Sequence, residues 1–286
     1  MAAARALGQR ARRASSALDR SMTHAETRRV LGHDPILVLS MGKTGTTSLT
    51  AAMKTACGRP VLKAHALSRA GIAKRIAKAD RLGVMPRPRF LWACEEISRA
   101  LQPGSRWDVV CGVRDPVALA VSDHFYGLQR QREVGLAPWV VDDDTTGHAE
   151  AISRILETEF IGSDWFEQEL KPSTGIDVYA DDFDSRAGYQ TYCHDSTRAI
   201  VLRAEDLSRV GGTAVADFLG LEAPLPVTRR NEGTGADPSS AYRGFLEASP
   251  LPVELIGRVY DTRLARHFYD DDERASFRAR WTGALV

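Results

Sequence analysis

A short run of small, basic and hydroxyl residues at positions 42–48 has the composition of an anion-binding loop. It follows an apolar stretch at 35–41 and precedes a helix-forming segment at 49–53. Glycines let the backbone turn tightly, and free N–H groups at the start of a helix point at a bound anion. A lysine adds positive charge, and hydroxyl groups add hydrogen bonds. The residues expected to contact the anion are Gly42, Lys43, Thr44, Gly45, Thr46, Thr47 and Ser48.

The spacing of this loop argues against a nucleoside triphosphate as its ligand. The phosphate loop of nucleotide triphosphatases has a first glycine, then four residues, then Gly-Lys-Ser/Thr. The position five residues before Gly42 is Leu37, inside the predicted strand, so that first glycine is missing. No apolar strand ends in a lone aspartate that would hold magnesium. A shorter kind of anion loop is therefore favoured, and a small-molecule kinase is kept as the alternative.

A second predicted strand, at 107–113, ends in a residue type that binds phosphate well. It is followed by Arg114, Asp115 and Pro116 and then by a helical pattern, and proline suits the first turn of a helix. Arg114 and Ser122 can meet on one phosphate, because arginine offers a two-pronged charged contact that a hydroxyl group completes. The structural alternative is that Arg114 pairs with a carboxylate and that Ser122 faces water.

Both segments resemble motifs of the P-loop sulfotransferases that use 3′-phosphoadenylyl sulfate (PAPS). The Lys-Thr-Gly-Thr-Thr-Ser pattern at 43–48 is similar to the loop that holds the 5′-phosphosulfate in that superfamily. An Arg-Asp-Pro strand end with a serine eight residues after the arginine is similar to its 3′-phosphate site, which implies that role for Arg114 and Ser122. The resemblance implies a sulfotransferase with PAPS as co-substrate and a hydroxyl-bearing acceptor.

Later segments resemble a bacterial family, the capsular polysaccharide synthesis proteins, which is itself similar to these sulfotransferases. The similarity would cover roughly residues 34–272. The segments that carry it are 165–170, 175–179, 201–207 and 267–269. An Asn-Lys-Trp-Tyr-Ser-like block that members often carry is replaced here by residues 231–242. The resemblance implies a glycan acceptor, and a non-catalytic scaffold in capsular polysaccharide assembly is the non-enzyme alternative.

Sulfuryl transfer needs a donor held in line, stabilised charge on the leaving phosphate, and a base for the acceptor hydroxyl. Lys43 is expected to meet the leaving oxygen and is the first predicted catalytic residue. His65 is the predicted base, because it follows the predicted strand at 60–64 and imidazole titrates near working pH. An ordinary surface or capping histidine is the alternative, and Glu95 or Glu96 is the second candidate base. No ligand spacing indicates a metal.

The order of apolar and helical segments predicts an α/β fold in one domain, residues 34–286. Strands are expected at 35–40, 60–64, 108–113 and 199–203, with a further strand or hairpin within 176–192. Helices are expected at 46–56, 67–80, 91–101, 117–132, 146–170, 213–219 and 252–281. This alternation favours a central, mostly parallel sheet with helices on both faces, a three-layer arrangement like that of P-loop sulfotransferases. Ligands of such sheets bind beyond the carboxyl ends of the strands, where both motifs lie.

Composition narrows the partners and the location of the protein. Lys and Arg (38) nearly balance Asp and Glu (37) in 286 residues, which argues against a nucleic-acid binder. The four cysteines are widely spaced, which favours a reducing, cytoplasmic setting. No apolar run approaches the roughly 20 residues that span a bilayer. Residues 1–33 are expected to form a basic, disordered or marginally helical tail, with weak contact to an anionic membrane surface as the alternative.

Two loop-like stretches and one further arginine complete the expectations. Loops are expected at 83–89 and 222–238, and the second could close over the 3′-phosphate. Arg203, at the end of a predicted strand, is expected either to contact an acidic acceptor or to pair with Glu205 or Asp206.

Overall fold

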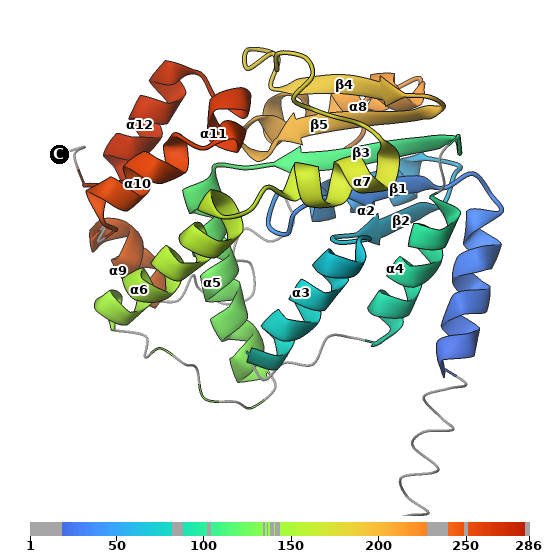
Figure 1. The fold of residues 1–286 in the computed structure, drawn as a ribbon. Helices are drawn as coiled ribbons and strands as arrows, with labels where there is room; N and C mark the ends of the chain where they lie inside the picture. Colours follow the sequence, from blue (N-terminus) through green and yellow to red (C-terminus); the bar gives the residue numbers. More distant parts are fainter. Residues whose placement is uncertain are drawn as a thin grey trace, which may run out of the picture.

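Five strands form one sheet in the order β2-β1-β3-β5-β4 (Figure 1). The strands are β1 Ile36–Leu39, β2 Val61–Ala64, β3 Trp107–Val113, β4 Tyr189–His194 and β5 Thr197–Arg203. β1 pairs in parallel with β2 and β3, and β3 pairs in parallel with β5. Only the edge strand β4, within the described residues, runs antiparallel to its neighbour, β5. The predicted α/β class with a mostly parallel central sheet is therefore confirmed.

The computed structural model describes residues 19–81, 88–101, 104–133, 135, 137, 140, 144–227, 240–248 and 251–283. Most of the two predicted loops at 83–89 and 222–238 lies outside these residues, as do residues 1–18. The α-helices are α2 Thr46–Ala56, α3 Arg69–Arg81, α4 Pro88–Ala100, α5 Pro116–Glu133, α6 Thr145–Leu156, α7 Lys171–Thr174, α8 Gly212–Leu219, α9 Ser240–Ala248, α10 Val253–Tyr260, α11 Arg263–Phe268 and α12 Asp271–Trp281. The shorter helical turns are η1 Glu157–Ile161, η2 Phe166–Leu170, η3 Ala204–Asp206 and η4 Leu207–Gly211.

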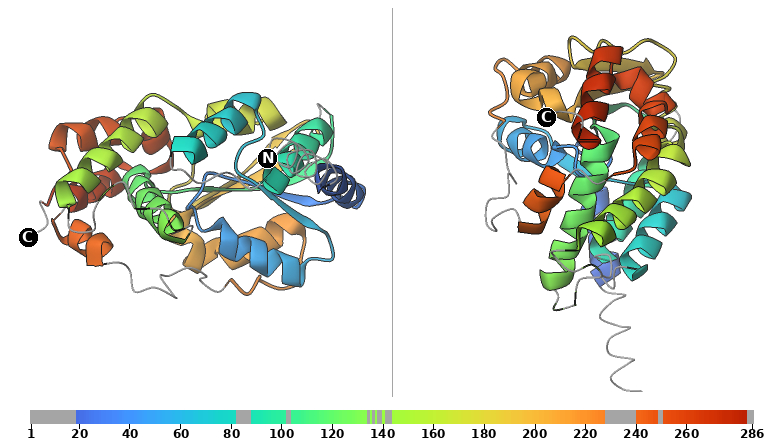
Figure 2. Two further views of the ribbon diagram at one scale, coloured as in Figure 1. Left: turned by 90° about the horizontal axis from the view of Figure 1, so that it is seen from below. Right: turned by 90° about the vertical axis from the view of Figure 1, so that its left-hand side faces the viewer.

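Helices cover both faces of the sheet, which makes three layers. Successive side chains of a strand point to opposite faces, so the apolar residues of each strand are shared between two cores. Ile36 and Val38 of β1 pack with residues of α2 and α8, whereas Leu37 and Leu39 pack with residues of α4, α5 and α6. Figure 2 shows α2 (blue) and α8 (orange) together on one side of the sheet, opposite α3, α4 and α7. Near-continuous apolar strands are the expected consequence of burial on both faces.

The helices predicted at 146–170 and 252–281 are each interrupted. The first stretch consists of α6 followed by η1 and η2, and the Asp164 carboxylate accepts a hydrogen bond from the Phe166 N–H (2.9 Å) where η2 begins. The second consists of α10, α11 and α12. Thr262 caps α11, and Asp270 forms a capping box with Glu273 at the start of α12. Polar side chains that bond nearby N–H groups start new helices, and these caps divide the stretch.

The described end of the basic N-terminal segment is a helix that packs beside α4. It covers residues 19–31 and lies next to α4 in Figure 1. His24 is buried and bonds the Glu96 carboxylate, and Arg20 forms an ion pair with Glu95 at 2.8 Å. Residues 19–31 therefore contact the rest of the chain through charged side chains. In the described ranges, no helix combines the length and the apolar character needed to cross a membrane.

Candidate anion-binding site

The loop between β1 and α2 has two residues in the left-handed region of backbone space. Lys43 has φ of 66° and Gly45 has φ of 74°. A Cβ atom at position 45 would also lie 2.4 Å from Leu207 Cδ1, so any other residue there would be strained and would displace that side chain. A non-glycine residue in this conformation is strained by about 1–3 kcal/mol, and such strain is concentrated at ligand-binding sites. The backbone of Lys43 therefore points to a binding role.

The same loop carries backbone N–H groups that no described residue uses. Among the described residues, none accepts a hydrogen bond from the N–H groups of residues 42–47, whereas the Ser48 N–H donates to the Gly45 carbonyl at 3.1 Å. Thr46 and Ser48 are buried in the first turn of α2, which has no acidic residue to repel an anion. Successive N–H groups in such a loop, at the start of a helix, form a concave site for an anion.

Around the loop, the hydroxyl groups of Ser40 and Thr44 form a buried pair, whereas Thr47 is exposed. The Thr44 hydroxyl is buried, donates to the Met41 carbonyl at 3.0 Å and lies 2.6 Å from the Ser40 hydroxyl. It therefore holds the loop in shape, and contact of Thr44 with an anion stays a prediction. Thr47 is exposed, and its hydroxyl accepts a hydrogen bond from Lys63 Nζ at 2.8 Å. The end of β2 thus adds a second ammonium group to the rim of the loop.

Strand β3 supports the loop from its neighbouring position in the sheet. The Gly112 N–H donates to the Ser40 hydroxyl at 3.3 Å, and a Cβ at position 112 would lie 2.8 Å from Thr44 Oγ1. The chain leaves β1 towards β2 and leaves β3 towards β5, in opposite directions along the sheet. Ligands of open α/β sheets bind at such a switch point, outside the carboxyl ends of the strands. The loop lies where this topology places a ligand.

Arg114 follows β3 directly and reaches the loop. Its Nη1 donates to the Lys43 carbonyl at 3.0 Å. The Lys43 ammonium lies 4.4 Å from the ring centre of Tyr126 on α5. Burial lowers the pKa of Lys43, Asp123 raises it and Arg114 lowers it further. The structure therefore brings Lys43 and Arg114 together at one end of the sheet.

Ser122 belongs to the same assembly through its place on α5. Residues three and four apart lie on one face of a helix, so Ser122 shares a face with Tyr126, as does Asp123. Tyr126 contacts the Lys43 ammonium, and Asp123 interacts with its charge. The face of α5 that carries Ser122 is therefore turned towards Lys43, and contact of Ser122 with a phosphate stays a prediction.

His65 follows β2 with one ring nitrogen fixed by the backbone. Nδ1 lies 2.7 Å from the Ser40 carbonyl, which can only accept, so Nδ1 carries the proton. In the neutral ring, Nε2 then carries the lone pair that a base needs. Burial and, after it, the charge of Arg75 lower the pKa of His65 to about 4, against smaller opposing effects of the Ser40 carbonyl and Asp123. The ring is therefore neutral at pH 7. It is a weaker base than the free imidazole that the sequence prediction assumed, because its pKa lies below the working pH.

The two other candidate bases lie on the side of α4 that faces the helix at 19–31. Glu95 pairs with Arg20 at 2.8 Å, and Glu96 is buried against His24. Both carboxylates therefore interact with basic side chains of the helix at 19–31. Neither is brought to the anion loop by a contact among the described residues.

Arg203 is held by ion pairs within the protein. Its Nη2 lies 2.6 Å from Asp206, and its Nη1 lies 2.7 Å from Glu273 on α12. The side chain is buried, so its charge needs these partners. Of the two roles expected for Arg203, pairing with a nearby carboxylate therefore explains its position better than contact with an acidic acceptor.

Four residues near the loop were not predicted from the sequence: Asp123, Tyr126, Arg75 and Lys78. Lys78 on α3 forms an ion pair with Asp123 on α5. Asp123 also interacts with the charges of Lys43, His65 and Arg75. A spacing of four residues from Ser122 would have found Tyr126. The contribution of α3 depends on the rotation of that helix, for which the sequence has no signal.

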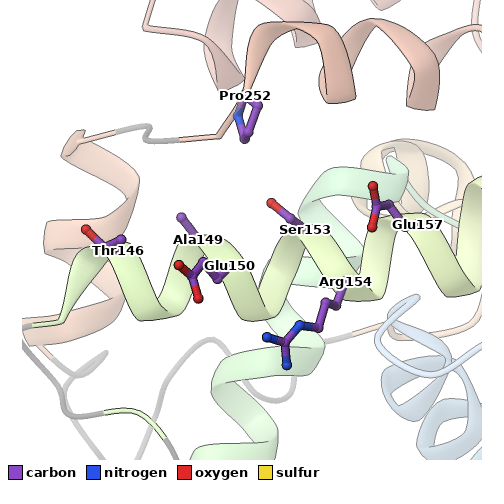
Figure 3. A pocket seen from close by; sticks show the side chains of 7 residues that line it. All are labelled: Thr146, Ala149, Glu150, Ser153, Arg154, Glu157 and Pro252. Atoms are coloured by element: carbon purple, nitrogen blue, oxygen red, sulfur yellow. The ribbon is translucent and has the colours of Figure 1, made fainter.

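A surface groove of about 370 Å³ lies apart from these residues. It is lined by one side of α6 and by Pro252, with Glu150, Arg154 and Glu157 along its length (Figure 3). None of its lining residues belongs to the loop at 42–48 or follows a strand of the sheet. The groove therefore contributes nothing to the anion site.

Comparisons with known proteins give no relatives for this chain. No protein-family model, curated protein or solved structure matches it. Among the described residues, no group of three or more His, Cys, Asp or Glu side chains is placed to hold a metal ion. The geometry of the loop, Arg114 and His65 is therefore the basis for assigning a function.

Proposed function

We propose that this chain is a PAPS-dependent sulfotransferase with a P-loop sulfotransferase-like fold. The observation that carries the proposal is that the unused N–H groups of residues 42–47 lie beside the Arg114 guanidinium. Two such groups at one sheet edge suit a ligand with phosphates at both of its ends. The sequence resemblance favours a hydroxyl acceptor on a glycan. The four described cysteines are unpaired, which supports a cytoplasmic location.

Each end of the donor has its own set of contacts in this proposal. The loop N–H groups and Lys43 hold the 5′-phosphosulfate, and Lys63 on the rim adds a further positive charge. Arg114 and Ser122 hold the 3′-phosphate. Because the Arg114 guanidinium already bonds the Lys43 carbonyl, the two contact sets are adjacent, as one mononucleotide requires.

The transfer step uses groups that the site already orients. The acceptor oxygen forms a bond to sulfur while the bond from sulfur to the 5′-phosphate oxygen breaks. His65 Nε2 takes the proton of the acceptor hydroxyl, because Nδ1 is held by the Ser40 carbonyl. Lys43 and the loop N–H groups stabilise the negative charge that develops on the leaving phosphate.

Calorimetry with adenosine 3′,5′-bisphosphate tests this proposal. We expect the bisphosphate to bind more tightly than ATP, because the loop is too short for a triphosphate and Arg114 needs a 3′-phosphate. At 100 times its dissociation constant, a ligand of the folded state adds about 2.7 kcal/mol of stability. That corresponds to a rise in Tm of roughly 5–10 °C for a domain of this size.

The two alternative functions give different results in the same experiment. Tight binding of ATP or GTP without binding of the bisphosphate would favour a small-molecule kinase. A scaffold would bind neither nucleotide and would show no rise in Tm. Either result would overturn the sulfotransferase assignment.

The titration of His65 is a second prediction, and it needs no knowledge of the acceptor. We expect NMR of labelled histidine to give His65 a pKa below 5, with the proton of the neutral ring on Nδ1. Added bisphosphate should raise this pKa, because a nearby anion stabilises the imidazolium. Arg75, Lys63 and Asp123 are the charged groups that act on this ring.

A His65→Gln variant assigns the resonance among the seven histidines of the chain. His33, which is exposed and precedes β1, is the internal control, and its resonance should not respond to the bisphosphate. If the His65 pKa lies near 6.5 and does not respond to the bisphosphate, His65 is solvated and lies away from the anion site.

A further inference from the structure

Helix α3 brings one arginine close to His65 on the β2 side of the loop. Arg75 Cζ lies 5.9 Å from the ring centre of Phe90, and the same ring lies 6.1 Å from the His65 ring. Arg75 is half-buried, and its charge lowers the pKa of His65. Figure 1 shows α3 beside α5, and the ion pair between Lys78 and Asp123 joins the two helices. Arg75 therefore lies at the side of the site where the proposed base stands.

Arg75 differs from its neighbours on α3 in having no ionic partner. Lys74 pairs with Glu159 at 2.7 Å and Lys78 pairs with Asp123, whereas Arg75 forms no ion pair within the described part of the chain. Burial lowers the pKa of Arg75, and the charges of Asp123, Glu169 and Glu159 partly oppose this effect. A partly buried cation that lacks a direct ion pair is costly.

The acidic residues around Arg75 are already occupied. Asp123 bonds Lys78. Glu169 is buried and accepts hydrogen bonds from the Leu67 N–H (2.8 Å), the Ser68 N–H (2.9 Å) and the Ser68 hydroxyl (2.6 Å). These carboxylates act on Arg75 only from a distance, so its guanidinium keeps donors for an anion from outside the described chain.

We propose that Arg75 binds a carboxylate of the acceptor, next to the hydroxyl group whose proton His65 takes. This inference rests on the proposed function and adds the class of acceptor to it. A planar guanidinium makes two parallel hydrogen bonds to a carboxylate, which positions the bound molecule as well as attracting it. The acceptor is then a hydroxy acid whose carboxylate and reacting hydroxyl group are a few bonds apart, as in a uronic acid unit of an acidic glycan. Lys43, Lys63 and Arg114 add to the positive field that attracts such an acceptor.

A matched pair of sugars tests the proposal. Methyl β-D-glucuronide and methyl β-D-glucoside differ by a carboxylate in place of a hydroxymethyl group. Their affinities for the protein are measured by NMR titration, with and without adenosine 3′,5′-bisphosphate. We expect the glucuronide to bind about tenfold more tightly or better. Arg75→Gln should remove most of the preference for the glucuronide, with a small remainder from the field of the other cations, and Arg75→Lys should keep more of it because it keeps the charge.

Arg69→Gln is the control, since Arg69 is exposed at the start of the same helix and has the same charge. It should keep the preference for the glucuronide. Equal affinities in the wild type, or a full preference in folded Arg75→Gln, would overturn the inference. If Arg75→Gln does not fold, a full preference in Arg75→Lys overturns it instead.

The two proposals fail in different ways in this experiment. Binding of the bisphosphate without any preference for the glucuronide rejects the acidic acceptor alone. A preference that depends on Arg75, in a protein that does not bind the bisphosphate, rejects the sulfotransferase and keeps the carboxylate site.

Discussion

The Lys43→Ala and Arg114→Gln variants are each expected to lose affinity for adenosine 3′,5′-bisphosphate by about 100-fold. Each substitution removes a charged hydrogen-bond donor from one end of the ligand. Arg114→Gln also removes the hydrogen bond from Nη1 to the Lys43 carbonyl, which holds the loop backbone. Isothermal titration calorimetry measures the affinities, and circular dichroism confirms that each variant is folded.

Arg106→Gln is the matched control for charge. Arg106 is exposed just before β3, at the opposite end of the strand from Arg114, so its loss changes net charge without touching the site. We expect its affinity for the bisphosphate to match that of the wild type. If Arg114→Gln or Lys43→Ala binds the bisphosphate normally, the assignment of that residue to the donor site is wrong.

A double variant shows whether the two residues act on the ligand as a coupled pair. Lys43 and Arg114 are neighbours through the Lys43 carbonyl, so their effects on affinity should not be additive. If the losses simply add, the two residues bind the ligand independently, and the hydrogen bond from Arg114 to the Lys43 carbonyl does not couple them.

Much of the sheet was predictable because burial on both faces leaves a clear pattern. β1, β3 and β5 are apolar runs whose side chains are nearly all buried, and each lies where the sequence predicted a strand. The interruptions of the late helices were missed, although their signal was present. Asp270 followed by Glu273 is a capping-box pattern, and such a pattern starts a new helix inside a stretch that otherwise has helical composition.

The core of the candidate site was predictable for a topological reason. Carboxyl ends of parallel strands meet at one edge of a sheet, so Lys43 after β1, His65 after β2 and Arg114 after β3 had to approach one another. The partners of other candidate residues, Arg203 and Glu96, could not be predicted in the same way. Arg203 pairs with Glu273, and Glu96 bonds His24, and these contacts join residues that are far apart in the sequence.

The surroundings of the loop depend on how helices are rotated about their axes. Arg75 and Asp123 approach the site because α3 and α5 present particular faces to it, and the ion pair of Lys78 with Asp123 joins those faces. Side-chain spacing shows which residues share a face, but it does not show which face turns to the sheet end. The acidic acceptor is therefore an inference that only the assembled structure could supply.

Loss of the buried Asp115 carboxylate is expected to have the largest effect on stability. Asp115 lies between Arg114 and α5, and its carboxylate accepts hydrogen bonds from the Tyr260 hydroxyl (2.6 Å), the Trp281 Nε1 (3.0 Å) and the Val117 N–H (3.0 Å). Tyr260 and Trp281 are buried ends of α10 and α12, so one carboxylate attaches the C-terminal helices to the end of β3.

The Asp115→Ala variant leaves these buried donors without an acceptor, and each orphaned group costs about 1–3 kcal/mol. We therefore expect the free energy of unfolding to fall by roughly 3–5 kcal/mol, measured by urea unfolding followed by circular dichroism. Tyr260→Phe removes one donor and should cost less, about 1–2 kcal/mol. Asp217→Ala, at an exposed site on α8, is the control and should change stability by under about 0.5 kcal/mol. If Asp115→Ala is no less stable than Asp217→Ala, the carboxylate does not hold α10 and α12 against β3. The hydrogen bond to the Lys43 carbonyl would then be the contact that positions Arg114.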